Sequence, residues 1–152
     1  MTQFCSFTLD GLFFGVSVSD VQEVIRAQPI TRVPLAPHVV RGLINLRGEI
    51  VMALDLRRRL SLPERDPNCP PMNVVVRIGD EAVCLLVDDI GEVLHPSEAS
   101  FELPPVTTNA AVRSFLKGVY KLERRLLLIL NTQRVIEVTP TSPLDGEAPI
   151  ER

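Results

Sequence analysis

Short apolar runs, separated by turn residues, fill most of this chain. Two such runs flank Asp10-Gly11 in the stretch QFCSFTLDGLFFGVSV, and Asp-Gly is a strong hairpin dipeptide. A second pair of runs turns near Gly79, and a third turns near Leu122-Glu123. Because the runs are short and rich in Val, Leu, Ile and Phe, they predict β-strands paired as hairpins.

A fourth hairpin is predicted in GLINLRGEIVMALDLRRRL, residues 42–60. Asn45 and Gly48 occupy the first and fourth positions of a type I turn, with Gly48 left-handed in a three-residue loop. This arrangement predicts that Leu46 and Arg47 lie at the centre of the turn with their side chains pointing outward. The alternative is that Leu46 folds back onto the protein and Arg47 is an ordinary solvated turn residue.

The chain contains two copies of one pattern. Residues 7–25 align with 76–94 at an offset of 69, and residues 40–60 align with 116–136 at an offset of 76. The matched positions include Glu23 with Glu92, Val24 with Val93, Gly42 with Gly118, Leu46 with Leu122, and Arg58 with Arg134. The sequence therefore predicts two versions of one small β unit, each a hairpin, a connection and a second hairpin. Units of this size most readily close into small barrels, which removes exposed strand edges.

Capping residues indicate where short helices begin. Asp55 and Asn131 each precede a predicted helical turn at the end of a unit. Ser19 with Gln22 three residues later forms a capping box, which predicts one or two further helical turns. Gly91 interrupts the equivalent stretch of the second copy, so we expect that stretch to remain extended.

The expected boundaries follow from composition. The folded domain spans residues 1–139, with subdomain 1 at about 1–62, a linker at 61–71 and subdomain 2 at about 72–139; some exchange of chain between the subdomains is possible. The linker is rich in proline and charge. The tail at 140–152 has too few apolar residues to pack, and we expect it to be disordered.

Charge and cysteine content narrow the function classes. The net charge is −3 and the pI is about 5.4, so nucleic-acid binding is not expected. Cys5, Cys69 and Cys84 are an odd number without CxxC spacing, which indicates free thiols in a reducing compartment. No signal peptide is evident, and no apolar run approaches the about 20 residues that span a bilayer. We therefore expect a cytoplasmic protein that does not insert into the membrane.

Catalytic motifs are not found in the sequence. It contains no HExxH, P-loop, GxSxG or GxGxxG pattern. His38 and His95 lie beside prolines in connections, and Asp88-Asp89 is better interpreted as a strand end that caps the next turn than as a metal site. Three adjacent arginines at 57–59 would point in different directions from a short helix. We therefore predict no catalytic residues, no metal and no cofactor. A small β-barrel enzyme with an unrecognised site is the alternative.

The motifs resemble the CheW family of chemotaxis coupling proteins. NLRG followed by DLR at this spacing is the most specific feature. Four family segments occur in order, at 21–25, 41–57, 83–94 and 118–136, and the resemblance covers roughly residues 3–138. A proline usual in the second strand of the NLRG hairpin is replaced around Met52-Ala53, and Cys84 stands where a small residue is common.

The resemblance implies an all-β fold with short helices: two small five-stranded SH3-like β-barrels that share a core. It also implies a non-catalytic adaptor that couples chemoreceptors (methyl-accepting chemotaxis proteins) to a CheA-type histidine kinase. A module of a non-motility chemosensory pathway is an alternative within the same class.

Site residues are implied by motif position. The resemblance assigns contact with the cytoplasmic tip of a chemoreceptor to Arg47, Glu23, Val21, Val24 and Gly42. The kinase's regulatory domain has the same fold in this family, and the two proteins are expected to pack barrel end to barrel end through apolar residues. Leu46 and Ile44 are assigned to that kinase-binding surface.

Overall fold

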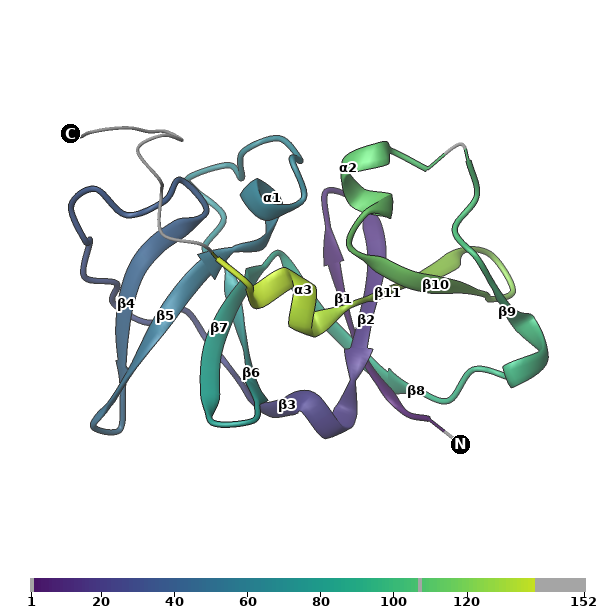
Figure 1. Cartoon of the computed structure of the whole chain (residues 1–152), viewed down its shortest axis with the longest axis horizontal. Coiled ribbons are helices and arrows are strands. Elements are labelled where there is room, and N and C mark those ends of the chain that lie inside the picture. Colours follow the sequence, from purple (N-terminus) through teal and green to yellow (C-terminus); the bar gives the residue numbers. More distant parts are fainter. Residues whose placement is uncertain (1, 107, 139–152) are drawn as a thin grey trace.

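The computed structural model describes residues 2–106 and 108–138, which form two β-sheets side by side (Figure 1). The five-stranded sheet has the order β3 (Val21–Ile25), β6 (Met72–Ile78), β7 (Glu81–Val87), β5 (Glu49–Asp55), β4 (Val40–Leu46). The six-stranded sheet has the order β8 (Asp89–Leu94), β1 (Phe4–Leu9), β2 (Leu12–Ser17), β11 (Leu126–Leu130), β10 (Leu116–Lys121), β9 (Phe101–Glu102). The short helices are η1 (Val18–Asp20), α1 (Leu56–Arg59), η2 (Glu98–Ser100), α2 (Ala110–Arg113) and α3 (Thr132–Ile136).

The internal repeat is confirmed by the strand order. Applying the two sequence offsets converts the order β3-β6-β7-β5-β4 into β8-β1-β2-β11-β10. Each sheet contains one parallel pairing, β5 with β7 in one and β2 with β11 in the other. The predicted all-β class with short helices is confirmed, and so are the hairpin turns near residues 10, 79 and 122.

The two sheets exchange a hairpin between the halves of the chain. The β1–β2 hairpin comes from the first half but pairs with β8 and β11, whereas the β6–β7 hairpin comes from the second half but pairs with β3 and β5. The sheets therefore do not divide the chain into 1–62 and 72–139; the exchange that was allowed as a possibility is what occurs. Each sheet needs strands from both halves, so neither half could form its sheet alone.

A shared core joins the sheets. Phe7 and Phe14 of the six-stranded sheet belong to the same cluster of buried side chains as Leu54 and Leu85 of the five-stranded sheet. The two phenylalanine rings stack with centroids 6.0 Å apart. Each sheet also has a smaller cluster of buried apolar side chains, to which the other sheet contributes no residue. Burial of the shared cluster is the main apolar contribution that fixes one sheet against the other.

The predicted helix caps are partly confirmed. Asp55 accepts a hydrogen bond from the backbone N–H of Arg58 at 3.2 Å, and Asn131 caps α3 in the same way at 3.1 Å. The capping box at Ser19 is wrong, because η1 is capped by Ser17 and ends before β3. Pairing of β3 with β6 satisfies the backbone groups there and outweighs the local helix signal. The stretch around Gly91 is extended in β8, as predicted.

Arg59 connects the two helices that end the repeats. Its guanidinium donates to the carbonyl of Val135 at 2.9 Å and of Arg134 at 3.1 Å, and also to that of Glu137. These carbonyls lie at the C-terminal end of α3, where the last turn of a helix leaves carbonyl groups available. Burial lowers the pKa of Arg59. The prediction that the three adjacent arginines diverge is confirmed, since Arg57 and Arg58 bind other groups.

All three cysteines are free thiols, as predicted. Burial raises the pKa of Cys84 to about 12, so its thiol stays protonated. Among the described helices, none has the length and apolar character needed to cross a membrane. The predicted disordered tail at 140–152 lies outside the described residues.

Candidate protein-binding site

The tip of the β4–β5 hairpin is a two-residue turn. Leu46 pairs directly with Glu49, so only Arg47 and Gly48 lie between the strands. Their φ angles are +53° and +92°, which corresponds to a type I′ turn. Asn45 accepts a hydrogen bond from the Gly48 N–H at 2.8 Å through its side-chain oxygen. The predicted three-residue loop is wrong, because two left-handed residues match the twist of the paired strands better.

Leu46 and Ile44 are buried, with 7% and 2% of their surfaces exposed. They pack with Val51 and Leu86 in the cluster inside the five-stranded sheet. Strand alternation turns both side chains inward and leaves Asn45 outside. The expectation of an exposed Leu46 is wrong, and the alternative, that it folds back, is confirmed. Neither side chain offers surface to a kinase in this conformation.

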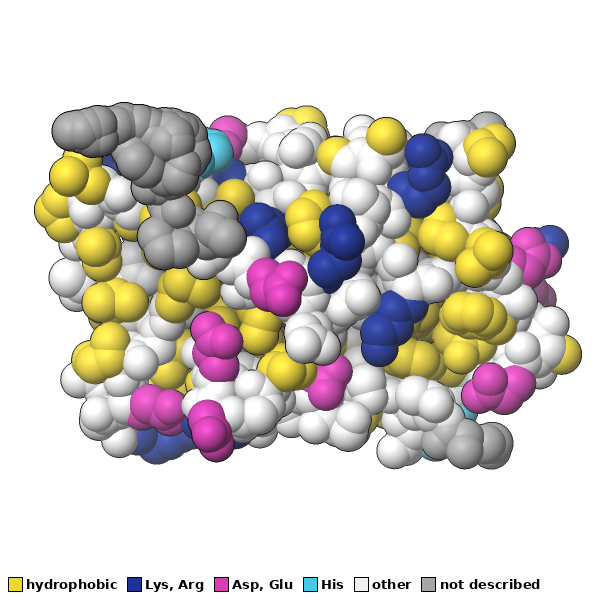
Figure 2. Space-filling model, in the orientation of Figure 1, with side chains coloured by type: hydrophobic (Ala, Val, Ile, Leu, Met, Phe, Trp, Pro, Cys, Tyr) yellow, Lys and Arg dark blue, Asp and Glu magenta, His cyan; other side chains and the backbone are white. Residues whose placement is uncertain are grey.

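Arg47 points outward and forms an ion pair with Glu23. Its side chain is 67% exposed, whereas that of Glu23 is 22% exposed. Glu23 lies on β3 and Arg47 follows β4, the two edge strands of the five-stranded sheet. The pair therefore links the two edges of this sheet, in addition to the backbone bridge between Thr31 and Leu43 on the outer side of β4. The hydrogen bond from Arg47 lowers the pKa of Glu23. Figure 2 shows acidic and basic side chains together at the lower left, where this hairpin ends in Figure 1.

Gly42 is buried and serves a close backbone contact. A Cβ at this position would lie 2.2 Å from the carbonyl oxygen of Thr31, and the φ angle is +151°. Thr31 and Leu43 exchange two backbone hydrogen bonds of 2.8 Å beside it. At Gly118, its counterpart in the repeat, a Cβ would lie 2.3 Å from the ring of Phe101 and 2.9 Å from the carbonyl oxygen of Glu102. The fold therefore explains why a glycine stands here, and Gly42 presents no side chain to a partner.

The valines of β3 differ in exposure. Val21 is half-buried, whereas Val24 is 38% exposed. Val93, the counterpart of Val24 on β8, is 49% exposed. The offset of 69 places Val93 opposite Val24 in the alignment, so the repeat itself is the signal that points to Val93. Each sheet thus presents a valine on an edge strand, and Figure 1 shows both strands at the lower side of the molecule.

A second surface is apolar and lies on the six-stranded sheet. Its exposed members, hereafter the β9 apolar surface, are Phe101, Leu103 and Val106, on β9 and the connection that follows it. A groove of about 430 Å³ adjoins it, lined in part by Leu12 and Leu126. Figure 2 shows hydrophobic side chains gathered where Figure 1 places β9 and β10. Large exposed apolar patches often mark protein interaction sites. The hydrophobic pattern of the sequence did not predict this surface.

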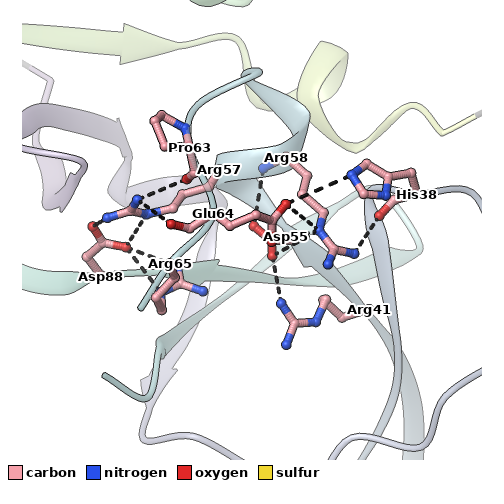
Figure 3. A network of polar contacts seen from close by, with 9 residues as sticks. All are labelled: His38, Arg41, Asp55, Arg57, Arg58, Pro63, Glu64, Arg65 and Asp88. Carbon is pink, nitrogen blue, oxygen red and sulfur yellow. Dashed lines mark hydrogen bonds and ion pairs between the residues drawn. The ribbon is translucent and has the colours of Figure 1, made fainter. Parts of the chain in front are cut away.

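A polar network lies around the connection between the sheets (Figure 3). Asp88, where the chain passes from β7 to β8, accepts hydrogen bonds of 3.0 and 2.5 Å from Arg57. It also accepts from Arg65 at 3.1 Å and from the backbone N–H of Asp10 at 2.9 Å. Asp88 does end a strand, as predicted, but it binds the β1–β2 turn and the linker instead of capping the next turn.

Asp55 forms the other half of the network. Its carboxylate is 2% exposed and accepts a hydrogen bond from Arg41 at 2.9 Å. Arg58 bridges the Glu64 carboxylate at 3.1 Å and the backbone carbonyl of His38 at 2.9 Å. The hydrogen bond from Arg58 lowers the pKa of Glu64. Because its carboxylates already have cationic partners, we interpret the network as a structural brace.

The Asp88 brace leads to a stability prediction. Replacing Asp88 by asparagine should lower the free energy of unfolding by about 2 kcal/mol at pH 7, because two guanidinium groups lose a partly buried carboxylate. Burial alone would raise the pKa of Asp88, but hydrogen bonds from Arg57, Asp10 and Arg65 outweigh it and the pKa is lowered. Its contribution is therefore present above the unfolded-state pKa of about 3.9 and is lost as the pH falls through the folded-state value.

Urea unfolding of the wild type and of Asp88→Asn at several pH values would check this. The difference between the two should shrink below about pH 4. Asp89→Asn is the control, since Asp89 is an exposed neighbour of the same charge. A difference that persists unchanged to low pH would show that the carboxylate charge is not what stabilises the junction.

Comparison with known proteins gives a consistent assignment. Residues 3–139 match the family model described as CheW-like domain. The chemotaxis protein CheW of Thermotoga maritima is 32% identical over 132 residues, covering 87% of this chain and 85% of that protein. The chemotaxis protein CheW of Bacillus subtilis is 30% identical over 131 residues, covering 86% and 84%. The crystal structure of the scaffolding protein TtCheW from Thermoanaerobacter tengcongensis matches with a TM-score of 0.80 and 29% identity, covering 91% of this chain and 94% of that chain.

Proposed function

The chain belongs to the CheW-like domain family, and on that basis we propose that it is a non-catalytic adaptor coupling chemoreceptors to a CheA-type histidine kinase. The relatives named above are chemotaxis and scaffolding proteins. The alternatives are a coupling module of a non-motility chemosensory pathway, which would use the same surfaces with different partners, and, less favoured, an enzyme of unknown type. Cytoplasmic placement is part of the proposal, because the partner domains of such an adaptor face the cytoplasm.

The observation that carries the proposal is the exposed Arg47 held on Glu23. A solvent-exposed arginine at a rigid two-residue turn keeps several N–H donors available to a partner. Its position is the one that the family resemblance assigns to receptor contact. We propose a receptor-facing surface formed by Arg47, Glu23 and Val24; Val21 is half-buried on the same strand, and Gly42 would act only through its backbone contact with Thr31.

We propose a different surface for the kinase than the buried Leu46 and Ile44. The β9 apolar surface lies on the other half of the molecule, and its side chains are exposed by 42% to 90%. Apolar side chains at the end of a barrel suit packing against a regulatory domain of similar fold. Separate surfaces on the two sheets would let one molecule hold a receptor and a kinase at the same time.

A direct test is reconstitution with a CheA-type kinase and a cytoplasmic receptor fragment. The adaptor should bind the kinase's regulatory domain, and kinase autophosphorylation should rise only when all three components are present. The adaptor alone should neither bind nor hydrolyse ATP, as measured by calorimetry and phosphate release. ATP binding that is lost on mutation of a defined site here would contradict an adaptor and favour an enzyme.

Leu103→Asp tests the kinase surface. Leu103 is 77% exposed, so the protein should fold normally, yet binding to the regulatory domain should weaken by about tenfold because a charge enters an apolar interface. Titration calorimetry with the isolated regulatory domain measures this. Leu35→Asp is the matched control, since Leu35 is 98% exposed and lies in the connection before β4. Equal weakening by both substitutions would refute the assignment of the kinase to the β9 apolar surface.

A further inference from the structure

A chain of polar contacts extends from the receptor-facing tip to β6. Arg77 on β6 donates from Nε to the side-chain oxygen of Gln22 at 2.7 Å and from Nη2 to both carboxylate oxygens of Glu49 at 3.1 Å. Gln22 in turn donates to Glu23 at 3.4 Å, and Glu23 accepts from Arg47. The guanidinium of Arg77 therefore contacts both β3, through Gln22, and the first residue of β5, Glu49.

Both partners of Arg77 lie close in sequence to the residues of the Arg47–Glu23 ion pair. Glu49 is the first residue after the Arg47-Gly48 turn, and Gln22 precedes Glu23 on β3. Arg77 thus fixes the base of the turn and the strand that carries the acceptor of Arg47. It also neutralises Glu49. Without Arg77, the carboxylate of Glu49 would lose this cationic partner. It would then compete with the carboxylate of Glu23 for Arg47.

The internal repeat shows that the fold does not require these contacts. The positions equivalent to Arg77, Gln22, Glu23, Arg47 and Glu49 hold Thr8, Gly91, Glu92, Glu123 and Arg125. Within the part of the chain that the structure describes, no side-chain hydrogen bond or ion pair joins those five equivalents. The second unit nevertheless has the corresponding strand order. The contacts are therefore specific to the tip that carries Arg47.

We infer that Arg77 is a positioning residue for the receptor-facing surface: it holds the β4–β5 tip against β3 so that Arg47 stays paired with Glu23. The inference rests on the proposed receptor contact at this tip. Arg77 acts through Glu49 and Gln22, and it is 37% exposed itself. Its removal should loosen the tip while leaving the barrel folded, because exposed polar pairs contribute little to global stability.

Arg77→Gln is the test, with two readouts. Amide hydrogen exchange at Leu46 and Glu49 should become about fivefold faster, because local opening of the tip becomes easier. Affinity for a cytoplasmic receptor fragment should fall by about fivefold, since the Arg47 geometry is then less often populated. Binding to the kinase regulatory domain and the urea midpoint should not change. Lys121→Gln is the matched control for amide exchange at the tip and for receptor affinity, because Lys121 forms an exposed ion pair of 2.8 Å with Glu102 on the other sheet.

A charge swap gives a rescue that a merely structural role in the barrel would not produce. Arg77→Glu with Glu49→Arg should restore slow amide exchange and most of the receptor affinity. Wild-type exchange and affinity in Arg77→Gln would overturn the inference. If Arg47→Glu weakens receptor binding but Arg77→Gln does not, only this inference fails. If neither does, the proposed receptor surface itself is wrong. Should Arg77→Gln fail to fold, Arg77→Lys supplies the same readouts, because it keeps the charge but loses the planar fork.

Discussion

Replacing Arg47 by glutamate is expected to weaken receptor-dependent kinase activation by about 30-fold, on the order of 2 kcal/mol, the scale of a binding hot spot. The substitution removes the guanidinium donors and places a carboxylate beside Glu23, so a partner that recognises the arginine meets a reversed charge. The urea midpoint should change little, since Arg47 is exposed. Arginine and glutamate also have a similar free-energy cost in the left-handed conformation that this turn requires.

The measurement is paired: urea unfolding for stability, and kinase activation by a receptor fragment for coupling. Glu123→Arg, at the equivalent tip of the second unit, should be near neutral in both assays. The double substitution Arg47→Glu with Glu23→Arg separates two roles. If the ion pair matters only for closing the barrel, the swap should restore coupling. If a partner binds Arg47, coupling should stay weak. Unfolding by Arg47→Glu alone would assign it a structural role.

Gly42→Ala is expected to lower the free energy of unfolding by about 3 kcal/mol and the Tm by about 10 °C. The added Cβ would meet the carbonyl oxygen of Thr31 at 2.2 Å and the side chain of Ile30 at 2.7 Å. To make room for this Cβ, the backbones of Thr31 and Leu43 must move apart, which breaks the two hydrogen bonds between them. The positive φ angle of Gly42 adds further strain.

Gly118→Ala is the matched control for this effect. Its new Cβ would meet the ring of Phe101, a 42% exposed residue, at 2.3 Å and the carbonyl oxygen of Glu102 at 2.9 Å, a wider backbone distance than the 2.2 Å at Gly42, and without the positive φ angle. We therefore expect a loss of about 1 kcal/mol there. Thermal unfolding of both variants would compare them. Wild-type stability of Gly42→Ala together with lost receptor binding would mean that Gly42 contacts the receptor directly, as motif position implied.

Local features of the sequence were sufficient for the hairpins and the helix caps. Asp10-Gly11 places its turn because these two residues tolerate the left-handed conformations that a tight hairpin needs. Asp55 and Asn131 cap their helices because a side-chain oxygen reaches a backbone N–H three residues on. The repeat offsets predicted two copies of one unit, and the two sheets have corresponding strand orders. Where a long-range pairing competed with a local signal, as at Ser19 and Gln22, the local signal failed.

The receptor-facing candidates were predictable only in part. Arg47 and Glu23 came from motif resemblance, but their mutual ion pair depends on which strands form the two edges of one sheet. The burial of Leu46 followed once the turn had two residues instead of three, because Leu46 then belongs to β4 and continues the inward alternation of Ile44. The β9 apolar surface was not predicted, since exposure depends on what else packs nearby.

The sequence by itself determined the elements, their twofold repetition and the family. Only the tertiary structure decided which hairpin belongs to which sheet, which carboxylate each arginine meets and which apolar residues stay exposed. Pairing β1–β2 with the strands of the second half places Asp10 beside Asp88, 78 residues away. Such contacts carry no local signal, because the groups that meet are brought together by burial of the core that both halves share.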